Sequence, residues 1–315
     1  MGLASGYPMD AVITCKFRKN KLCSAVEAER LLSFTNTADP LFMFGAVAVG
    51  MFAMPEIGAI LAAAHYLSSF LVGIIFRFYG RDRDEPPPPP LKNNHSIIVR
   101  AFQALAAAKR ADHRDFSQLL GDSVKTSMNT IFLIGGFIMI FSVFLRIIAS
   151  VGLTNYLNIF FAYGLELIGY HASLSQSLVS GLFEIDLGAL VASQTDAPLS
   201  EKVAITSAII AWSGLSVHGQ VASIVIESGI RMTPYVIGRC IHAVLAAIIS
   251  IILMKSQIVT SLFVMPVTQS SYGQSGLWLA QLEQTSYLLF LFISILLCLS
   301  FSFQLIKQFG KCIKK

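Results

Sequence analysis

The stretch EAERLLSFTNTADPLFMFGAVAVGMF, residues 27–52, contains one apolar helix that is interrupted in its middle. Residues 24–37 have a helical pattern, the pattern stops at Asp39-Pro40, and residues 41–53 then run apolar. An aspartate followed by a proline is typical of an N-cap with proline at the first helical position. The stretch therefore predicts one membrane crossing made of two half-helices.

The composition of the whole chain also indicates a membrane protein. Of its 315 residues, 55% are hydrophobic and 13% are charged, whereas roughly a quarter of the residues in a soluble chain are charged. The 23 phenylalanines exclude a disordered chain. The net charge of +5 comes from basic residues that punctuate the apolar segments instead of forming one patch, so we expect no nucleic-acid partner. Five cysteines without a CxxC pair predict no metal site, and we expect no cofactor.

The other apolar segments divide the chain into parts. Residues 57–79 are long enough to span about 30 Å of hydrocarbon. Five consecutive prolines then mark an extended linker, and a mixed-charge amphipathic helix is predicted over 96–125, at the membrane surface. Further apolar segments lie at 126–149, 154–170, 173–193, 200–228, 232–254 and 285–306. We predict a first repeat at 1–79, a cytoplasmic linker and surface helix at 80–125, a second transmembrane half at 126–306 and a basic cytoplasmic tail at 307–315.

Basic residues predict the direction of the spans. The loop 15–22 has four positive residues, the stretch 77–125 has nine, and the tail after Leu305 has four lysines. The positive-inside rule places all three in the cytoplasm. The loop 256–284 has neither Lys nor Arg and is expected outside. Two later segments are also interrupted in mid-span, 173–193 by Glu184 and Asp186 and 200–228 by Ser213-Gly214-Leu215-Ser216 and His218. Counting crossings from these loops gives the segments 24–54 and 200–228 opposite orientations.

A shift of 174 residues brings these two segments into register. It pairs Glu27 with Glu201, Ser33 with Ser207, Leu41 with Leu215, Gly45 with Gly219 and Val47 with Val221. The break at Asp39-Pro40 then falls on Ser213-Gly214. We therefore predict an all-α, polytopic transmembrane protein with an inverted-topology repeat, whose second copy is 173–228. Secondary transporters build their midplane substrate sites from such interrupted helices, whose N-termini favour an anionic solute.

Three stretches carry a family resemblance: SGYPMDA at 5–11, the interrupted helix at 27–52, and SGLFEIDLG at 180–188. In them the chain resembles the sporulation integral membrane protein YlbJ (SpoVV) family, a branch of the nucleoside-recognition or Gate-domain membrane proteins. The resemblance implies a protein of the inner or forespore membrane of a spore-forming bacterium that moves dipicolinic acid, a pyridine dicarboxylate. It also implies transmembrane helices before the GYP stretch, so we expect an N-terminally shortened chain.

Polar residues at the breaks are the candidate substrate-binding residues. Asn36 and Asp39 can hydrogen-bond a solute, although Asp39 can equally serve only as a cap. Tyr7 can stack on an aromatic ring or simply pack. Glu184 is an ionisable residue inside an apolar segment, which makes it a candidate for proton coupling. The alternative is an internally paired structural glutamate. Asp186 is expected to face an aqueous cavity.

The second break supplies three more candidate binding residues, namely Ser213, Ser216 and His218. The alternative for them is helix capping by serine and a buried neutral histidine. We expect no enzyme, because no GxSxG, HExxH or GxxxxGK[ST] motif occurs. The predicted function is an alternating-access carrier for a small carboxylate in the lipid bilayer. A non-transporting scaffold of the spore envelope and a nucleoside or cation carrier remain alternatives, and homo-oligomerisation is left open.

Overall fold

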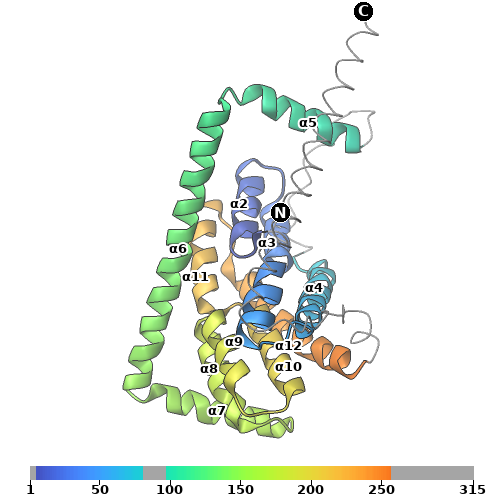
Figure 1. The fold of residues 1–315 in the computed structure, drawn as a ribbon. Helices are drawn as coiled ribbons and strands as arrows, with labels where there is room; N and C mark the ends of the chain where they lie inside the picture. The colour runs from blue at the N-terminus through green and yellow to red at the C-terminus, as the bar shows by residue number, and fades with distance from the viewer. Residues whose placement is uncertain (1–4, 81–96, 257–315) are drawn as a thin grey trace, which may run out of the picture. The chain divides into compact units, whose positions relative to one another are not determined.

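The computed structural model describes residues 5–80 and 97–256, and these described residues are all-helical. The predicted span at 285–306, the tail at 307–315 and the linker prolines lie outside them. The helices, drawn in Figure 1, are α2 (Met9–Lys19), α3 (Ala25–Thr35), the π-helix η1 (Phe42–Met51), α4 (Ile57–Phe76), α5 (Ile97–Ala111), α6 (Phe116–Ser150), α7 (Leu153–Leu167), the 3-10 turn η3 (Ala172–Leu174), α8 (Ser175–Phe183), α9 (Ile185–Gln194), α10 (Leu199–Trp212), α11 (Gly214–Val225), the 3-10 turn η4 (Ile226–Ser228) and α12 (Met232–Lys255).

Four helical stretches of the described chain are long and apolar enough to cross a membrane. They are Ile57–Phe76, Phe116–Ser150, Leu199–Ser228 and Met232–Lys255. Only 6% of the apolar window of α6 is buried in the protein, whereas 61% of that in the stretch Leu199–Ser228 is buried. Because exposed apolar side chains are favourable in hydrocarbon, α6 has the composition of a lipid-facing helix.

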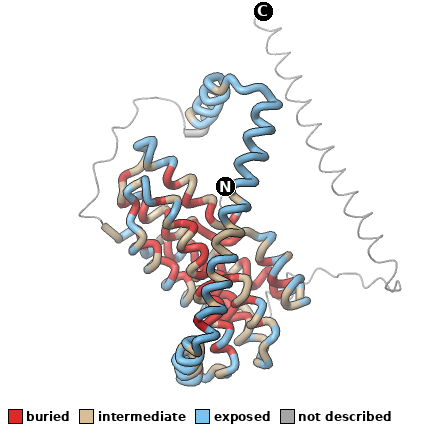
Figure 2. The backbone as a smooth tube through the Cα atoms, turned by 90° about the vertical axis from the view of Figure 1, so that its left-hand side faces the viewer, coloured by how far each residue is buried: buried red, intermediate tan, exposed pale blue. Residues whose placement is uncertain are grey.

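The buried residues gather around α12, which packs against α10, α4 and α3 (Figure 2). One apolar cluster contains Met43, Leu61 and Ile210, and a second contains Leu32 and Tyr235. Both broken helices therefore contribute to the protein interior. This position agrees with the requirement that irregular backbone at membrane depth be buried in protein.

The predicted break in the first half is confirmed. Helix α3 ends at Thr35, and a new helical segment begins at Pro40. The Asp39 carboxylate accepts a hydrogen bond from the Phe42 N–H at 2.8 Å, which is the predicted cap. The second half-helix is wound as a π-helix, a rare form that is common at functional sites. The sequence did not predict this winding.

Two breaks in the second half are confirmed as well, and they touch. Segment 173–193 is interrupted at Glu184, which has extended backbone, and segment 200–228 at Ser213, where φ is +70°. Gly214 also has a positive φ, and a Cβ atom there would lie 3.0 Å from the Phe183 carbonyl oxygen. Glycine at this position therefore permits both the turn and the close contact between the two breaks.

The predicted surface helix over 96–125 is wrong in its extent. Helix α5 ends at Ala111, and α6 begins at Phe116 and continues to Ser150. The predicted boundary between residues 125 and 126 thus falls inside one continuous helix of 35 residues.

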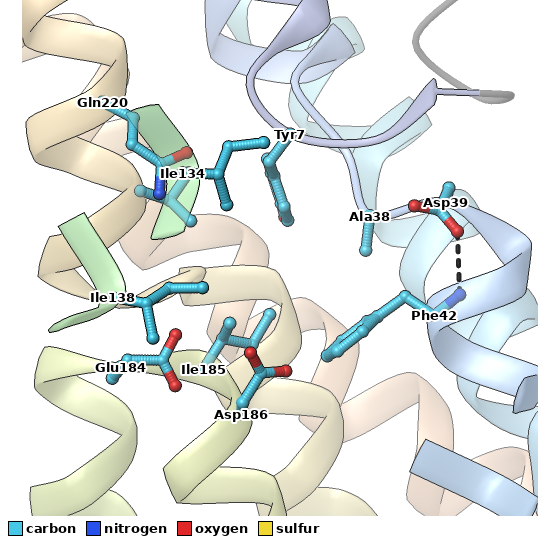
Figure 3. A pocket seen from close by; sticks show the side chains of 11 residues that line it. Tyr7, Ala38, Asp39, Phe42, Ile134, Ile138, Glu184, Ile185, Asp186 and Gln220 are labelled. Carbon is cyan, nitrogen blue, oxygen red and sulfur yellow. Dashed lines mark hydrogen bonds between the residues drawn. The ribbon is translucent and has the colours of Figure 1, made fainter. Parts of the chain in front are cut away.

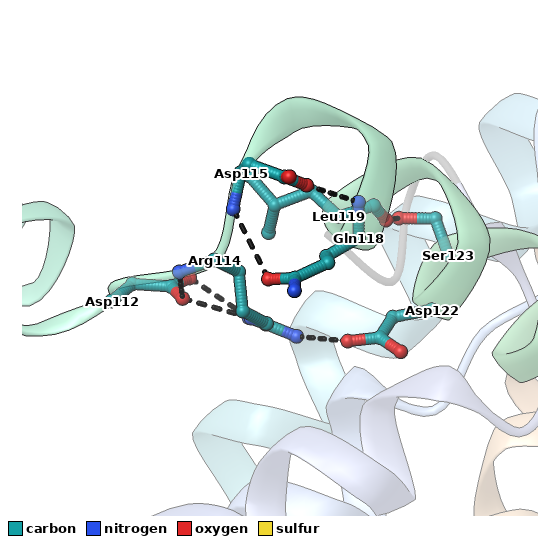
Figure 4. Close-up of polar contacts among 7 residues, drawn as sticks. All are labelled: Asp112, Arg114, Asp115, Gln118, Leu119, Asp122 and Ser123. Carbon is teal, nitrogen blue, oxygen red and sulfur yellow. Dashed lines mark hydrogen bonds and ion pairs between the residues drawn. The ribbon is translucent and has the colours of Figure 1, made fainter.

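Local hydrogen bonds explain the early break (Figure 4). Asp115 caps α6 by accepting the Gln118 N–H at 2.7 Å, and the Gln118 side chain accepts the Asp115 N–H in return. Arg114 binds Asp112 at 2.8 Å and Asp122 at 2.7 Å. The hydrogen bonds from Arg114 lower the pKa of Asp112 to about 2. An Asp-x-x-Gln capping pair therefore ends one helix and starts the next, and the apolar pattern alone does not contain this information.

Candidate substrate site

A pocket of about 140 Å³ lies where the helix breaks meet (Figure 3). Its polar lining consists of Tyr7, Asp39, Glu184, Asp186 and Gln220. Its apolar lining consists of Ala38, Phe42, Ile134, Ile138, Ile185 and Val217. The pocket thus joins the loop before α2, the first break, α6, the α8–α9 break and α11. Three of the predicted site residues, Tyr7, Asp39 and Glu184, line it together, and Asp186 faces it as expected.

The lining is acidic, since the described residues that form it include three carboxylates and no Lys, Arg or His. Glu184 is 1% exposed. One of its oxygens, Oε2, accepts the Leu187 N–H at 3.0 Å, while Oε1 has no hydrogen-bond partner among the described residues. The Oε1 atom of Gln220 is likewise buried and unpartnered there. Buried oxygens without a partner cost free energy, and each is a candidate contact for a ligand.

Asp39 and Tyr7 hold the opposite wall of the pocket. Asp39 caps η1 through Oδ1, and its Oδ2 lies so near Gly6 that a Cβ atom there would be 2.5 Å away. The Tyr7 hydroxyl donates to the Ile210 carbonyl oxygen at 3.1 Å, which leaves the ring to line the pocket. Capping by Asp39 and packing by Tyr7 are therefore compatible with contact to a solute.

Asn36 lies behind the pocket lining. It is fully buried, and its amide donates to the Tyr235 hydroxyl at 2.8 Å. The backbone carbonyl oxygen of Asn36 accepts a hydrogen bond from the Arg239 guanidinium group at 2.8 Å. Asn36 thus holds the first break in place, and it is absent from the pocket lining formed by the described residues.

The three predicted residues of the second break also lie outside the pocket lining. His218 Nδ1 donates a hydrogen bond to the Gly214 carbonyl oxygen at 2.8 Å, and its ring lies 4.3 Å from the Trp212 ring. Ser213 donates to the Trp212 carbonyl oxygen. Ser216 is fully buried. Because the pocket lining lacks all three side chains, their predicted contact with a solute stays a prediction.

Arg239 is the main residue that the sequence analysis missed. It is fully buried in α12 and donates to the carbonyl oxygens of Ser33 at 2.6 Å, Asn36 at 2.8 Å and Ala211 at 3.4 Å. These carbonyls lie at the C-terminal ends of α3 and α10. An arginine inside the predicted span 232–254 was the available signal, because a charge within a membrane segment is costly unless it has a specific role.

Helix α4 satisfies the backbone N–H and carbonyl groups of Ala38 in the first break. His65 accepts the Ala38 N–H at 3.0 Å through Nε2, and the Tyr66 hydroxyl donates to the Ala38 carbonyl oxygen at 3.0 Å. His242 of α12 in turn binds the His65 carbonyl at 2.8 Å. The backbone groups of Ala38 thus find hydrogen-bond partners inside the protein, as a membrane interior requires.

Comparison with known proteins gives one close relative. The chain is 42% identical over 255 residues to the sporulation integral membrane protein YlbJ of Bacillus subtilis (strain 168). The match covers 81% of the chain and 62% of that protein, so the chain spans less than two thirds of the relative. No family model and no solved structure matches the chain.

Proposed function

Because the chain is an integral membrane protein and a homologue of the sporulation protein YlbJ, we propose that it carries a small carboxylate, such as dipicolinic acid, across the cell or forespore membrane of a spore-forming bacterium. The observation that carries the proposal is the pocket between the break at Asp39 and the break at Glu184, both of which interrupt apolar segments. A break at membrane depth exposes backbone and polar side chains to a cavity, which is the usual construction of a carrier's substrate site.

The proposed transport mode is alternating access by two inverted repeats. In the first half, a short segment at Gly6 packs against the break at Asp39. In the second half, the break at Glu184 packs against Gly214. Each half thus pairs an interrupted helix with a shorter segment that precedes it in the chain, and this arrangement supports the proposed repeat. Movement of one repeat relative to the other would expose the pocket to each side in turn.

We assign proton coupling to Glu184. A carboxylate solute would be repelled by an ionised Glu184, because like charges at short distance raise each other's energy. A proton on Glu184 removes that repulsion and leaves a hydrogen-bond donor for the solute. Flux should then depend on pH, and the dependence should disappear when the carboxyl is removed.

Two alternatives remain. The acidic lining favours a cation carrier of the wider Gate group over a nucleoside carrier, since no described basic side chain offsets the three carboxylates. A non-transporting scaffold of the spore envelope would use the breaks only for packing. We also retain the proposal that the chain is not an enzyme.

Uptake of labelled dipicolinate into proteoliposomes over a range of pH values tests the proposal. We expect Glu184→Gln to reduce flux at least about tenfold, which corresponds to about 1.4 kcal/mol in a barrier, and to flatten its pH dependence. Glu166→Gln, at an exposed position of α7, is the matched control and should transport normally. Unchanged flux and pH dependence in Glu184→Gln would exclude the proton role. Absence of flux from the folded parent protein would favour the scaffold.

A further inference from the structure

A second hollow lies between α7, α8, α10 and α12. Its volume is about 320 Å³, and it is distinct from the acidic pocket, because the two share no lining residue. None of the described residues that line it is charged, and Ala208 and Ala243 among them are small enough to leave the space open. The Trp212 indole N–H is already used, since it donates to the Leu182 carbonyl oxygen at 3.1 Å. The hollow therefore offers an occupant mainly apolar surface.

The hollow lies at the depth of the bilayer centre and opens on the lipid-facing side of α12. The 24 residues of α12 extend about 36 Å, and Ala243 lies at the midpoint, so the hollow is near the middle of about 30 Å of hydrocarbon. On the same helix Ile237, Cys240, Val244 and Ile248 are exposed at spacings of three and four residues, which places them on one face. Because Cys240 also lines the hollow, the hollow is continuous with the surface that α12 presents to lipid.

The size and chemistry of the hollow suit a hydrocarbon chain. An α-helix about 10 Å across that rises 1.5 Å per residue fills about 120 Å³ per residue, so the hollow holds fewer than about three residues of a helix. An apolar cavity of about 150 Å³ binds one benzene molecule, so this hollow has room for about twelve hydrocarbon carbons. Water finds too few polar partners there, and an empty hollow would forfeit dispersion contacts with its lining.

We propose that the hollow binds the end of a lipid acyl chain from the surrounding bilayer, packed against Trp212. Acyl chains end at the middle of a bilayer, which is the depth of the hollow. The chain end would pack on a contact between two helix breaks. Trp212 directly precedes the break at Ser213, and Leu182, which accepts its indole N–H, lies two residues before the break at Glu184. Lipid in the hollow thus supports the joint between the two breaks, whatever solute the acidic pocket takes.

Quenching of Trp212 fluorescence by brominated phospholipids, in the full chain reconstituted into bilayers, tests the site. Every sample carries Trp278→Phe, which leaves Trp212 as the only tryptophan. We expect bromines near the ends of the acyl chains to quench Trp212, and bromines near the headgroup to quench it much less. Ala243→Phe fills the hollow and should remove most of the quenching. Val244→Phe adds the same ring at an exposed position outside the lining, so it is the control and should keep the quenching.

Three results overturn the lipid site. They are a Trp212 that chain-end bromines do not quench, equal quenching in Ala243→Phe and its parent, and a protein segment in the hollow. Oxidation in the membrane that joins Cys240 to Cys298, or to Cys240 of a second copy, would show such a segment by peptide mass spectrometry. Thermal unfolding shows whether each variant is folded, and Ala208→Ile fills the hollow from α10 if Ala243→Phe is not. Quenching requires no transport, so these outcomes are independent of the carrier function.

Discussion

Replacement of Arg239 is expected to destabilise both broken helices at once. The guanidinium group is fully buried and donates to the Ser33, Asn36 and Ala211 carbonyl oxygens. Each helix C-terminus carries about half a negative elementary charge, so the ends of α3 and α10 together balance about one positive charge. Arg239→Met keeps a long side chain but removes the charge and all the donors.

The magnitude follows from these contacts. Interhelical hydrogen bonds in membrane proteins contribute about 0.6 kcal/mol each on average, so the loss of three gives a lower bound of about 2 kcal/mol. Buried acceptors left without a partner cost about 1–3 kcal/mol each, which places the upper bound at about 9 kcal/mol. Even the lower bound corresponds to a fall of about 3 °C in the unfolding midpoint of a chain of 315 residues, because the entropy of unfolding is about 2.1 cal/mol/K per residue.

Thermal unfolding of the purified protein in detergent, followed by size-exclusion chromatography, measures the effect. Arg239→Lys keeps the charge but loses the planar fork of donors, so it should lie between Arg239→Met and the parent. Lys255→Met, at the exposed end of the same helix, is the control and should unfold at the parent's temperature. An Arg239→Met protein as stable as the parent would refute the idea that this side chain holds the two helix ends.

Two further predictions concern other parts of the fold. Gly188→Ala should destabilise the α8–α9 pair by about 1–3 kcal/mol, because a Cβ atom there would lie 2.3 Å from the Cα atom of Gly181. Gly135→Ala on α6, where nothing lies within 4 Å, is the control and should not destabilise the protein. Thermal unfolding compares the two variants. The Asp112 carboxyl has its pKa lowered from 3.8 to about 2 by the hydrogen bonds from Arg114, so its contribution to the α5–α6 corner is complete above pH 3.8 and disappears as the pH falls through about 2. A carbon-detected NMR titration, with Asp112→Asn to assign the signal, checks this; titration at the ordinary value would contradict the ion pair.

The breaks were predictable because their signals are local. Asp39-Pro40 specifies a cap and a first helical turn from adjacent residues, and Glu184 is conspicuous as a charge inside an apolar segment. The end of α5 was missed because it depends on a capping pair and an arginine bridge, whereas the prediction used apolar spacing. Contacts between helices have no such local signal. Asn36 and Tyr235 are distant in the sequence, and only the folded chain shows that their side chains bind each other.

The difference between local signals and interhelical contacts also explains why only some of the predicted site residues line the pocket. Asp39 and Glu184 lie at two separate breaks, Tyr7 lies in the loop before α2, and all three face the cavity between them. Asn36 lies at the first break and His218 follows the break at Ser213, but their side chains bind other partners inside the protein, the Tyr235 hydroxyl and the Gly214 carbonyl oxygen. A break in a membrane helix creates more unpaired backbone groups than one solute can bind, so most polar side chains near it must satisfy the protein itself.

Arg239 also restricts how the pocket can open. Because one side chain of α12 binds carbonyl oxygens of both α3 and α10, these three helices can separate only by breaking hydrogen bonds to a buried charge. The wall formed by Ile134 and Ile138 has no such charged restraint, since α6 is apolar there and only 6% of its membrane window is buried in the protein. Displacement of α6 exchanges apolar contacts with protein for apolar contacts with lipid, which changes the free energy little. Displacement of α6 would therefore open the acidic pocket without breaking a hydrogen bond to Arg239, whereas movement of one repeat relative to the other must break some of those that join α3 and α10 to α12.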